Sequence, residues 1–275
     1  MEAQDEKTFT SSREAPSDAD RRFGGVARVY GSRALERFRT SRVAVIGVGG
    51  VGSWTVEALA RSGVGTLVLF DPDHAAESNI NRQLHALDST LGNAKVQVLR
   101  ERIADINPDC RVETVEDFVT PGNLDQMLIP GELDYVVDCS DSFRTKAAII
   151  AHARRTRMAL LTVGGAGGQQ DPTRIRVVDL SRSAQDPLLA KVRRLLRQQY
   201  GFSRNPKRRF DVPCVYSDEQ MVFPGADGGV CLGRPAGTAG TDLSCAGGLG
   251  SAVTVTASFG FAAAARCLAH LARLA

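Results

Sequence analysis

The first part of the chain alternates between short apolar runs and longer segments with helical spacing. Strands are predicted at residues 43–47, 66–70, 112–115, 135–139 and 160–163. The first of them is an unbroken apolar run that ends in glycine, which is typical of a parallel strand buried on both faces. Apolar residues recur at helical spacing in the intervening segments and predict helices at 53–62, 95–106 and 143–155. Strands that alternate with helices indicate an α/β fold with a Rossmann-like, doubly wound, mostly parallel sheet.

The pattern changes after residue 165. Residues 175–180 alternate between apolar and polar positions, which predicts an antiparallel strand. Residues 182–209, which we call the basic segment, contain nine Lys and Arg residues against one Asp. Residues 224–250 are rich in glycine. These features predict a C-terminal extension that holds antiparallel strands and a basic crossover segment.

Residues 246–265 contain no charged side chain and are about long enough to cross a membrane. Glycine, serine and threonine recur throughout this stretch and lower its hydrophobicity. We therefore expect a buried helix of a water-soluble domain and no contact with a membrane.

Charge and cysteine content exclude several classes of protein. The net charge is only +3, so any contact with nucleic acid needs a local basic patch. The six cysteines include no C-x-x-C pair, which excludes the common zinc site built from two such pairs. They are too few and scattered for a secreted disulfide scaffold. Residues 1–20 have neither the basic start nor the apolar stretch of a leader, so we expect a reducing cytoplasm.

Residues 47–52 satisfy the pattern G-x-G-x-x-G between a predicted strand and a predicted helix. The glycines of this loop are Gly47, Gly49, Gly50 and Gly52. Glycine lets the backbone approach a phosphate, and the helix N-terminus offers free N–H groups to an anion. Asp71 follows the next strand, where its carboxylate can accept hydrogen bonds from ribose hydroxyls. This combination predicts a nucleotide site and fits NAD and ATP equally well.

Further polar groups favour ATP over a nicotinamide cofactor. Asn79 and Arg82 follow the second predicted strand. Lys95 begins the next helix, and Asp141 follows the fourth strand. All lie at the carboxyl edge of the sheet, where open α/β folds bind ligands. Arg82 can hold phosphate oxygens bidentately, Lys95 can act as a point charge, and Asp141 can hold Mg²⁺ directly or through water.

As a set, these motifs resemble the adenylation domain of the ubiquitin-activating superfamily of ThiF- and MoeB-like enzymes. The matching elements are G-x-G-G-x-G-S, the Asp after the second strand, N-x-x-R-Q, the Lys of N-A-K, and D-x-x-D-S. The resemblance implies that Asp71 binds ribose and that Asn79, Arg82 and Lys95 bind phosphates. It also implies that Asp141 holds magnesium, and that Arg82, Lys95 and Asp141 are catalytic.

Segments outside this site resemble the branch of the superfamily that cyclises threonylcarbamoyladenosine in tRNA. They lie at residues 22–31, 164–173, 185–188 and 245–247, which extends the resemblance over about residues 21–272. It implies ATP-dependent dehydration of that nucleoside beside the anticodon, through adenylation of its threonyl carboxylate. It further implies a cytoplasmic homodimer and a cysteine desulfurase or sulfur-acceptor partner.

The expected organisation is one adenylation domain over residues 21–275. Its nucleotide-binding half covers about 41–165, and its substrate and dimer half covers about 166–275. Residues 1–20 are acidic and polar, which predicts a disordered tail.

Three features each allow two interpretations. The basic segment predicts either a surface for tRNA phosphates or a solvated loop with scattered arginines. Related adenylating enzymes place an N-terminal arginine on a nucleotide of their own or a partner subunit, and either Arg22 or Arg28 fits that role. Cys245 is either a sulfur-handling thiol or a small buried side chain.

Three other functions stay open at this point. The first is adenylation of the C-terminus of a ubiquitin-like sulfur-carrier protein, which the absence of C-x-x-C pairs disfavours. The second is a non-catalytic scaffold, which the presence of Arg82, Lys95 and Asp141 disfavours. The third is a dehydrogenase, since the glycine loop alone also suits NAD.

Overall fold

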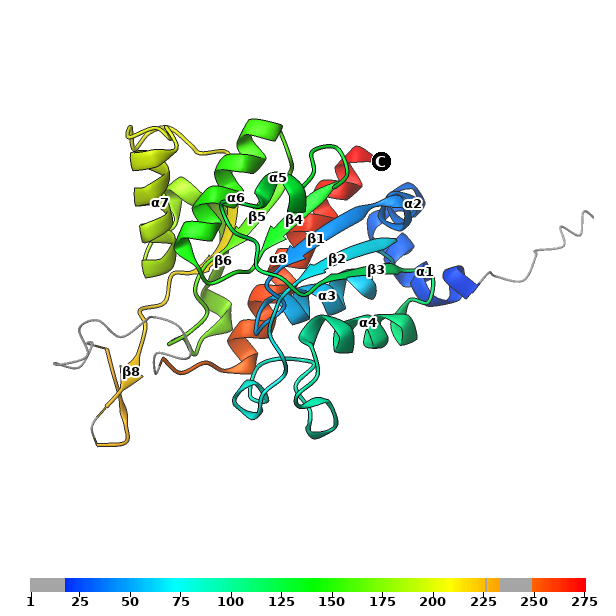
Figure 1. Cartoon of the computed structure of the whole chain (residues 1–275), viewed down its shortest axis with the longest axis horizontal. Helices are drawn as coiled ribbons and strands as arrows, with labels where there is room; N and C mark the ends of the chain where they lie inside the picture. Colours follow the sequence, from blue (N-terminus) through cyan, green and yellow to red (C-terminus); the bar gives the residue numbers. More distant parts are fainter. Residues whose placement is uncertain (1–17, 226, 233–248) are drawn as a thin grey trace, which may run out of the picture.

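A seven-stranded sheet with the order β3-β2-β1-β4-β5-β7-β6 lies at the centre of the computed structural model, which describes residues 18–225, 227–232 and 249–275 (Figure 1). Its strands are β1 (Arg42–Ile46), β2 (Thr66–Phe70), β3 (Arg111–Val115), β4 (Tyr135–Asp138), β5 (Leu160–Val163), β6 (Ile175–Asp179) and β7 (Pro213–Ser217). Every neighbouring pair is parallel except β6 with β7. The predicted Rossmann-like α/β fold with an antiparallel strand in its C-terminal part is confirmed.

Helices cover both faces of this sheet (Figure 1). They are α1 (Asp18–Tyr30), α2 (Ser32–Thr40), α3 (Gly52–Ala60), α4 (Lys95–Ile106), α5 (Leu124–Met127), α6 (Phe143–Thr156), α7 (Pro187–Gln199) and α8 (Val253–Leu271). Side chains of α3, α4 and α8 join one hydrophobic core, and those of α5, α6 and α7 join the core on the opposite face. A two-stranded hairpin, β8 (Phe223–Pro224) with β9 (Val230–Cys231), extends from the body of the domain (Figure 1).

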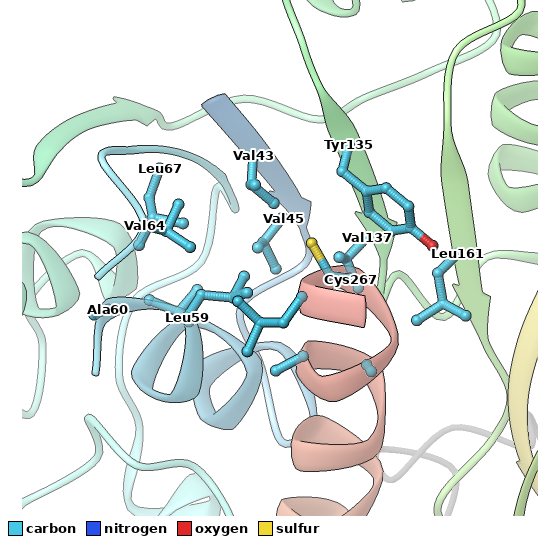
Figure 2. Packing of buried hydrophobic residues seen from close by; sticks show 14 of the residues in the cluster. Val43, Val45, Leu59, Ala60, Val64, Leu67, Tyr135, Val137, Leu161 and Cys267 are labelled. Carbon is cyan, nitrogen blue, oxygen red and sulfur yellow. The ribbon is translucent and has the colours of Figure 1, made fainter. Parts of the chain in front are cut away.

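Alternation along β1 divides its side chains between the two cores. Val43 and Val45 pack on the α3 and α8 side, whereas Ala44 and Ile46 pack on the α6 side. Figure 2 shows Val43 and Val45 beside Tyr135 of β4, with Cys267 of α8 packed beneath them. A strand buried on both faces needs an apolar residue at every position, which explains the unbroken run in the sequence.

The uncharged stretch near the C-terminus forms α8, as expected for a core helix, although the helix begins at Val253. Among the described residues, only Val253–Leu274 is long and apolar enough to span a membrane. Of the apolar 18-residue stretch within it, 56% is buried inside the fold. At Gly260 a Cβ atom would lie 2.6 Å from the carbonyl oxygen of Val51 in the loop before α3. The small residues of α8 therefore allow close packing of two helices.

The structure extends the domain at its N-terminal side. α1 begins at Asp18, so the expected tail of residues 1–20 is wrong for its last three positions, while residues 1–17 lie outside the described part. The amphipathic helices α1 and α2 place Phe23, Leu35 and Phe38 in the core. These apolar side chains are the physical reason why this segment folds onto the sheet rather than staying solvated.

Candidate functional site

The glycine loop connects β1 to α3 at the carboxyl end of β1. Gly47 has a φ angle of 79°, a left-handed conformation that costs glycine little. A Cβ atom at Gly52 would lie 1.9 Å from the carbonyl oxygen of Gly47, so only glycine fits there. Gly49 and Gly50 face the segment after β2, because a Cβ atom at Gly50 would lie 3.4 Å from the Arg82 side chain. The loop thus exposes backbone close to a cation.

Asp71 follows β2 directly and is only 7% exposed. Its carboxylate accepts hydrogen bonds from the backbone N–H groups of Val48, at 2.8 Å, and Asp73, at 3.0 Å. Burial raises the pKa of Asp71 above its usual value, and the charge of Lys95 and the two N–H groups oppose that shift. Because a carboxylate has about four acceptor positions, Asp71 keeps capacity for ribose hydroxyls.

Lys95 begins α4 and is 5% exposed. Its Nζ lies 2.8 Å from Oδ2 of Asp73 and 4.0 Å from Oδ1 of Asp71. The Asp73 side chain is 62% exposed, so it can turn into solvent when another anion approaches Lys95. The structure therefore holds one buried cation beside the glycine loop with a partner that is easily displaced.

Asn79 and Arg82 lie in a short turn of 3₁₀ helix, Glu77–Asn79, and the residues after it. The Asn79 side-chain oxygen accepts a hydrogen bond from the backbone N–H three residues earlier. One terminal nitrogen of Arg82 donates to the Ser78 carbonyl oxygen at 2.6 Å and to Oδ1 of Asn81 at 2.9 Å. Trp54 of α3 donates from Nε1 to the Arg82 carbonyl oxygen at 3.0 Å and thereby fixes this segment against the glycine loop.

Asp141 is exposed in the turn between β4 and α6. Since β4 pairs with β1, this turn lies at the same edge of the sheet as the glycine loop. Within the described ranges, no hydrogen bond or ion pair joins Asp141 to Arg82 or Lys95. The structure thus brings Asp71, Asn79, Arg82 and Lys95 together around the glycine loop. It places Asp141 at the same edge of the sheet, in the turn that follows β4.

A buried charge pair supports the turn that carries Asp141, and sequence reasoning missed it. Asp138 and Lys146 are both 0% exposed, with Nζ of Lys146 3.2 Å from Oδ2 of Asp138 and 3.0 Å from its carbonyl oxygen. Oδ1 of Asp138 accepts hydrogen bonds from the backbone N–H and the hydroxyl of Ser140, and Oδ2 accepts one from Thr162. The pair therefore fixes the backbone of the turn one residue before Asp141.

Asp186 attaches α7 to the same edge of the sheet. It is 3% exposed and caps α7 by accepting a hydrogen bond from the Leu189 N–H at 2.8 Å, and it accepts another from Gly165 N–H, after β5, at 3.0 Å. Burial raises its pKa above the usual value, and the charge of Lys146 opposes the shift. The residues Gln185 to Leu188 thus have a structural role, in which Asp186 is the cap and Pro187 the first helical residue.

Two buried side chains close to Arg82 in the chain have polar atoms without a hydrogen-bond partner among the residues that the structure describes. His85 is 1% exposed with neither ring nitrogen hydrogen-bonded, and Oε1 of Gln83, which is 7% exposed, is also unpaired. Burial, together with the charge of Lys95, lowers the pKa of His85 to about 4. His85 is therefore neutral at physiological pH and adds no positive charge to the site.

An open hollow of about 550 Å³ lies beside the Arg82 turn. Its lining includes Ser78, Asn81 and Arg82 on one side and Leu249 to Ser251 on the other. Nδ2 of Asn81 donates a hydrogen bond to the Ser251 carbonyl oxygen at 2.8 Å, which links the two sides. Arg82 therefore borders a space large enough for part of a substrate.

The two candidate N-terminal arginines, Arg22 and Arg28, lie on α1, far from the glycine loop. Arg22 contacts Asp18 and the carbonyl oxygen of Ile106, where α4 ends, so α1 lies at the edge opposite the glycine loop. Arg28 is exposed on the same helix, and neither arginine lies beside the nucleotide site of its own chain. Cys245 lies outside the described residues. Across residues 18–225, 227–232 and 249–275, no three His, Cys, Asp or Glu side chains are grouped to hold a metal ion.

About half of the basic segment is helical. Residues 187–199 form α7, so the interpretation as a solvated loop is wrong for this part. Leu189, Val192 and Leu196 are fully buried and attach one face of the helix to the core.

Comparison with known proteins agrees with this geometry. The profile of the ThiF family matches residues 21–269. The tRNA threonylcarbamoyladenosine dehydratase of Escherichia coli (strain K12) is 49% identical over 92% of this chain and 94% of its own length. The Haemophilus influenzae protein of the same name is 47% identical over 92% of this chain and 94% of its own length.

Solved structures give the same result. A structure described as TcdA (CsdL) superposes with a TM-score of 0.84 at 48% identity, covering 93% of this chain and 96% of the other. The E. coli tRNA N6-threonylcarbamoyladenosine dehydratase in complex with ATP superposes with a TM-score of 0.82 at 46% identity, covering 94% of this chain and 96% of the other. The chain therefore belongs to the ThiF family, and within it to the tRNA threonylcarbamoyladenosine dehydratases.

Proposed function

We propose that this protein uses ATP to dehydrate threonylcarbamoyladenosine in tRNA, closing a ring beside the anticodon. The observation that carries the proposal is the cluster at the carboxyl edge of β1 and β2, where a glycine loop, Asp71, Arg82 and Lys95 meet. Relatives with this activity in their name match the chain over 92% of its length. The corresponding enzyme class is an ATP-dependent ligase or cyclase that acts on tRNA.

Each residue of the cluster has a role that follows from its chemistry. Asp71 accepts hydrogen bonds from the ribose hydroxyls with the acceptor positions that Val48 and Asp73 leave open. The glycine loop and the N-terminus of α3 offer N–H groups to the phosphates. Asn79 donates its amide N–H to a phosphate oxygen, and Arg82 and Lys95 supply positive charge where the phosphates gain negative charge.

Asp141 is the proposed residue for magnesium. It is an exposed oxygen donor at the right edge of the sheet, and one carboxylate suffices because Mg²⁺ is usually bound by one or two carboxylates together with substrate phosphates. The ion, when bound, would neutralise phosphate charge as the leaving group departs. Asp138 and Lys146 hold the turn that presents this carboxylate.

The reaction needs an activated carboxylate. The threonyl carboxylate attacks the α-phosphate of ATP, the bond to the β-phosphate breaks, and pyrophosphate leaves. An oxygen or nitrogen of the neighbouring carbamoyl group then attacks the acyl-adenylate carbon and loses its proton to solvent. The bond from that carbon to the AMP oxygen breaks, and AMP leaves with its electron pair. The net change in the nucleoside is the loss of one water. Because the attack is intramolecular, positioning supplies much of the rate, and no enzyme nucleophile is required.

The partners follow from the same proposal. The substrate is tRNA bearing threonylcarbamoyladenosine, and the protein works in the cytoplasm as a homodimer. Arg28 lies at the edge opposite its own glycine loop, so we assign any contact it makes with a nucleotide to the partner subunit's site. A cysteine desulfurase or sulfur-acceptor protein is a further proposed partner.

The test is ATP–pyrophosphate exchange with tRNA that carries threonylcarbamoyladenosine, with unmodified tRNA and without tRNA. We expect exchange only with the modified tRNA, and a loss of about 100-fold or more in Arg82→Ala, by analogy with removal of one donor to a developing charge. Arg100→Ala, which removes an exposed cation of α4 outside the cluster, is the matched control and should exchange like wild type.

Two results would redirect the assignment. Exchange that needs a ubiquitin-like sulfur carrier and ignores tRNA would make the protein a sulfur-carrier activator. Equal exchange by Arg82→Ala and wild type would remove Arg82 from the reaction.

A further inference from the structure

The nine cations of the basic segment divide into two groups with different surroundings. Two of them, Arg193 and Arg197, are half-buried and contact their own domain. The other seven are exposed: Arg182, Lys191, Arg194, Arg204, Lys207, Arg208 and Arg209. We call these seven the basic surface.

The half-buried pair builds the support for the basic surface. Arg193 donates a hydrogen bond to the hydroxyl of Ser183, and Arg197 donates to the carbonyl oxygen of Ser203 at 3.4 Å. The Arg197 guanidinium also lies 5.1 Å from the ring centre of Phe210. These contacts attach the residues on both sides of α7 to the helix itself, Ser183 before it and Ser203 and Phe210 after it.

Within the described residues, the basic surface differs from the rest of the molecule in its lack of ion pairs. Elsewhere many arginines form ion pairs, for example Arg42 with Glu113 and Arg102 with Glu57. In the part of the chain that the structure describes, none of the nine cations of the basic segment forms an ion pair. An unbalanced group of exposed cations is costly in self-repulsion unless an anion lies against it.

One end of the basic surface lies beside the turn that carries Asp141, at the carboxyl edge of the sheet. Nζ of Lys191 on α7 lies 5.7 Å from the ring centre of Phe143, the first residue of α6, and Arg144 lies over the same ring at 5.6 Å. Phe143 follows Asp141 by two residues. Lys191 and Arg194 share the solvent face of α7, three residues apart, opposite the buried face.

The far end of the basic surface returns to the start of the segment. Arg182 donates a hydrogen bond from a guanidinium nitrogen to the Lys207 carbonyl oxygen at 3.3 Å. The residues after α7 therefore fold back and place Lys207 and its neighbours next to Arg182. Cations from the two ends of the basic segment are thereby brought together on the folded domain.

From this arrangement we infer that the basic surface binds the phosphate backbone of the substrate tRNA and thereby directs the anticodon arm toward Asp141. The inference rests on the proposed function, and it assigns the recognition of the polyanion to α7 and the segment after it. Arg193 and Arg197 act as positioning residues and contact no phosphate. Phosphate contacts carry no sequence information, so base recognition belongs to another part of the protein.

The test compares tRNA binding by wild type with binding by R194A/K207A/R208A, which removes three exposed cations. Labelled unmodified tRNA is titrated between about 50 and 200 mM salt, and log K is plotted against log salt. We expect the triple variant to reduce the slope by about 2 to 3, because each lost phosphate contact removes about 0.9 from it. The KM for tRNA in the exchange assay should rise by at least tenfold.

Two control variants distinguish a loss of local positive charge from a loss of folded structure. R33A/R100A/R273A removes three exposed cations from α2, α4 and the C-terminal 3₁₀ turn Ala272–Leu274, and should keep the wild-type slope. R194K/R208K/R209K keeps the charge and should keep most of the slope. A wild-type melting temperature and ATP affinity in the alanine variant establish that it is folded.

The outcomes distinguish this inference from the proposed function. An unchanged slope and KM in R194A/K207A/R208A would overturn the inference, because tRNA would then bind elsewhere. An equal loss of slope in R33A/R100A/R273A would overturn it too, because the effect would come from net charge. A reduced slope with no tRNA-dependent exchange by wild type would support the basic surface while rejecting the proposed reaction.

Discussion

The two buried lysines at the carboxyl edge of the sheet and the cations of the basic surface have opposite surroundings. Lys95 and Lys146 are 5% and 0% exposed, and each lies within 3.2 Å of a carboxylate oxygen. The seven cations of the basic surface are exposed, and within the described residues none has an acidic partner. The protein therefore presents positive charge in two ways. In our proposals the buried lysines serve a compact nucleotide and the exposed cations serve an extended polyanion.

The difference shows what each arrangement is suited to do. A buried cation has lost its water, so its position is set by the fold and its attraction for an incoming phosphate is weakly screened by salt. An exposed cation can adjust its position, and its attraction falls steeply with salt. ATP binding should consequently depend little on salt, whereas tRNA binding should depend strongly on it.

The largest expected effect tests the buried side of this comparison. Lys146→Met leaves the carboxylate of Asp138 buried without its cation and should lower the free energy of unfolding by about 3 to 5 kcal/mol. Denaturant unfolding measures it. The double variant K146M/D138L, which removes both charges, should recover most of the loss.

A small effect of Lys146→Met would mean that water reaches Asp138, and that the two regions differ less than the burial suggests. An equally unstable double variant would indicate that the hydrogen bonds of Asp138 to Ser140 and Thr162, rather than its charge, hold the turn.

The next effect concerns His85, the neutral neighbour of Lys95. Its pKa is about 4 in the folded protein and about 6.5 when unfolded, so the unfolded state binds the proton more tightly in this range. Stability is therefore fully present above pH 6.5 and is lost as pH falls toward 4, by about 3 kcal/mol at most. His85→Leu should flatten that part of the stability curve, measured by denaturant unfolding at several pH values.

The opposite slope would identify a different group. Asp71 and Asp186 have raised pKa values, so their contribution to stability decreases as pH rises above their usual range. If His85→Leu and wild type show the same pH dependence, the imidazole is hydrated or paired and carries no special role beside Lys95.

The smallest expected effect tests the exposed side. R194A/K207A/R208A should change the free energy of unfolding by less than about 0.5 kcal/mol, because exposed side chains without partners contribute little to folding. At low salt a slight stabilisation is expected, since like charges are removed. Thermal unfolding at low and high salt measures it. A loss of several kcal/mol would show that these side chains support the fold and are not reserved for an anion.

The sequence predicted those parts of the fold whose signals are local. The strands at 66–70 and 160–163 and the helix at 95–106 have the bounds expected, because an unbroken apolar run or a regular helical spacing ends abruptly in each case. The helix α7 has local signals as well, in the Asp186 cap, Pro187 and the apolar positions 189, 192 and 196. The density of charge in this segment is equally typical of a solvated loop, so the local signals for a helix and for a loop compete there.

The parts of the site that sequence reasoning missed depend on contacts between different elements. Asp138 and Lys146 become partners only because α6 turns back over the end of β4. Asp186 meets Gly165 because α7 returns to the sheet after β6 has been added at its edge. No pattern in a single segment records such a meeting, whereas Asp71, Arg82 and Lys95 were found because each belongs to a short motif.

The position of α8 has a consequence for the synthesis of this protein. α8 completes the core over β1 and β4, although most of the length of the chain separates it from β1 (Figure 2). At about 5 to 20 residues per second, a ribosome adds the intervening residues in roughly 10 to 40 seconds. During that interval one apolar face of the finished strands lacks its cover, so the nascent chain is a natural client for a chaperone.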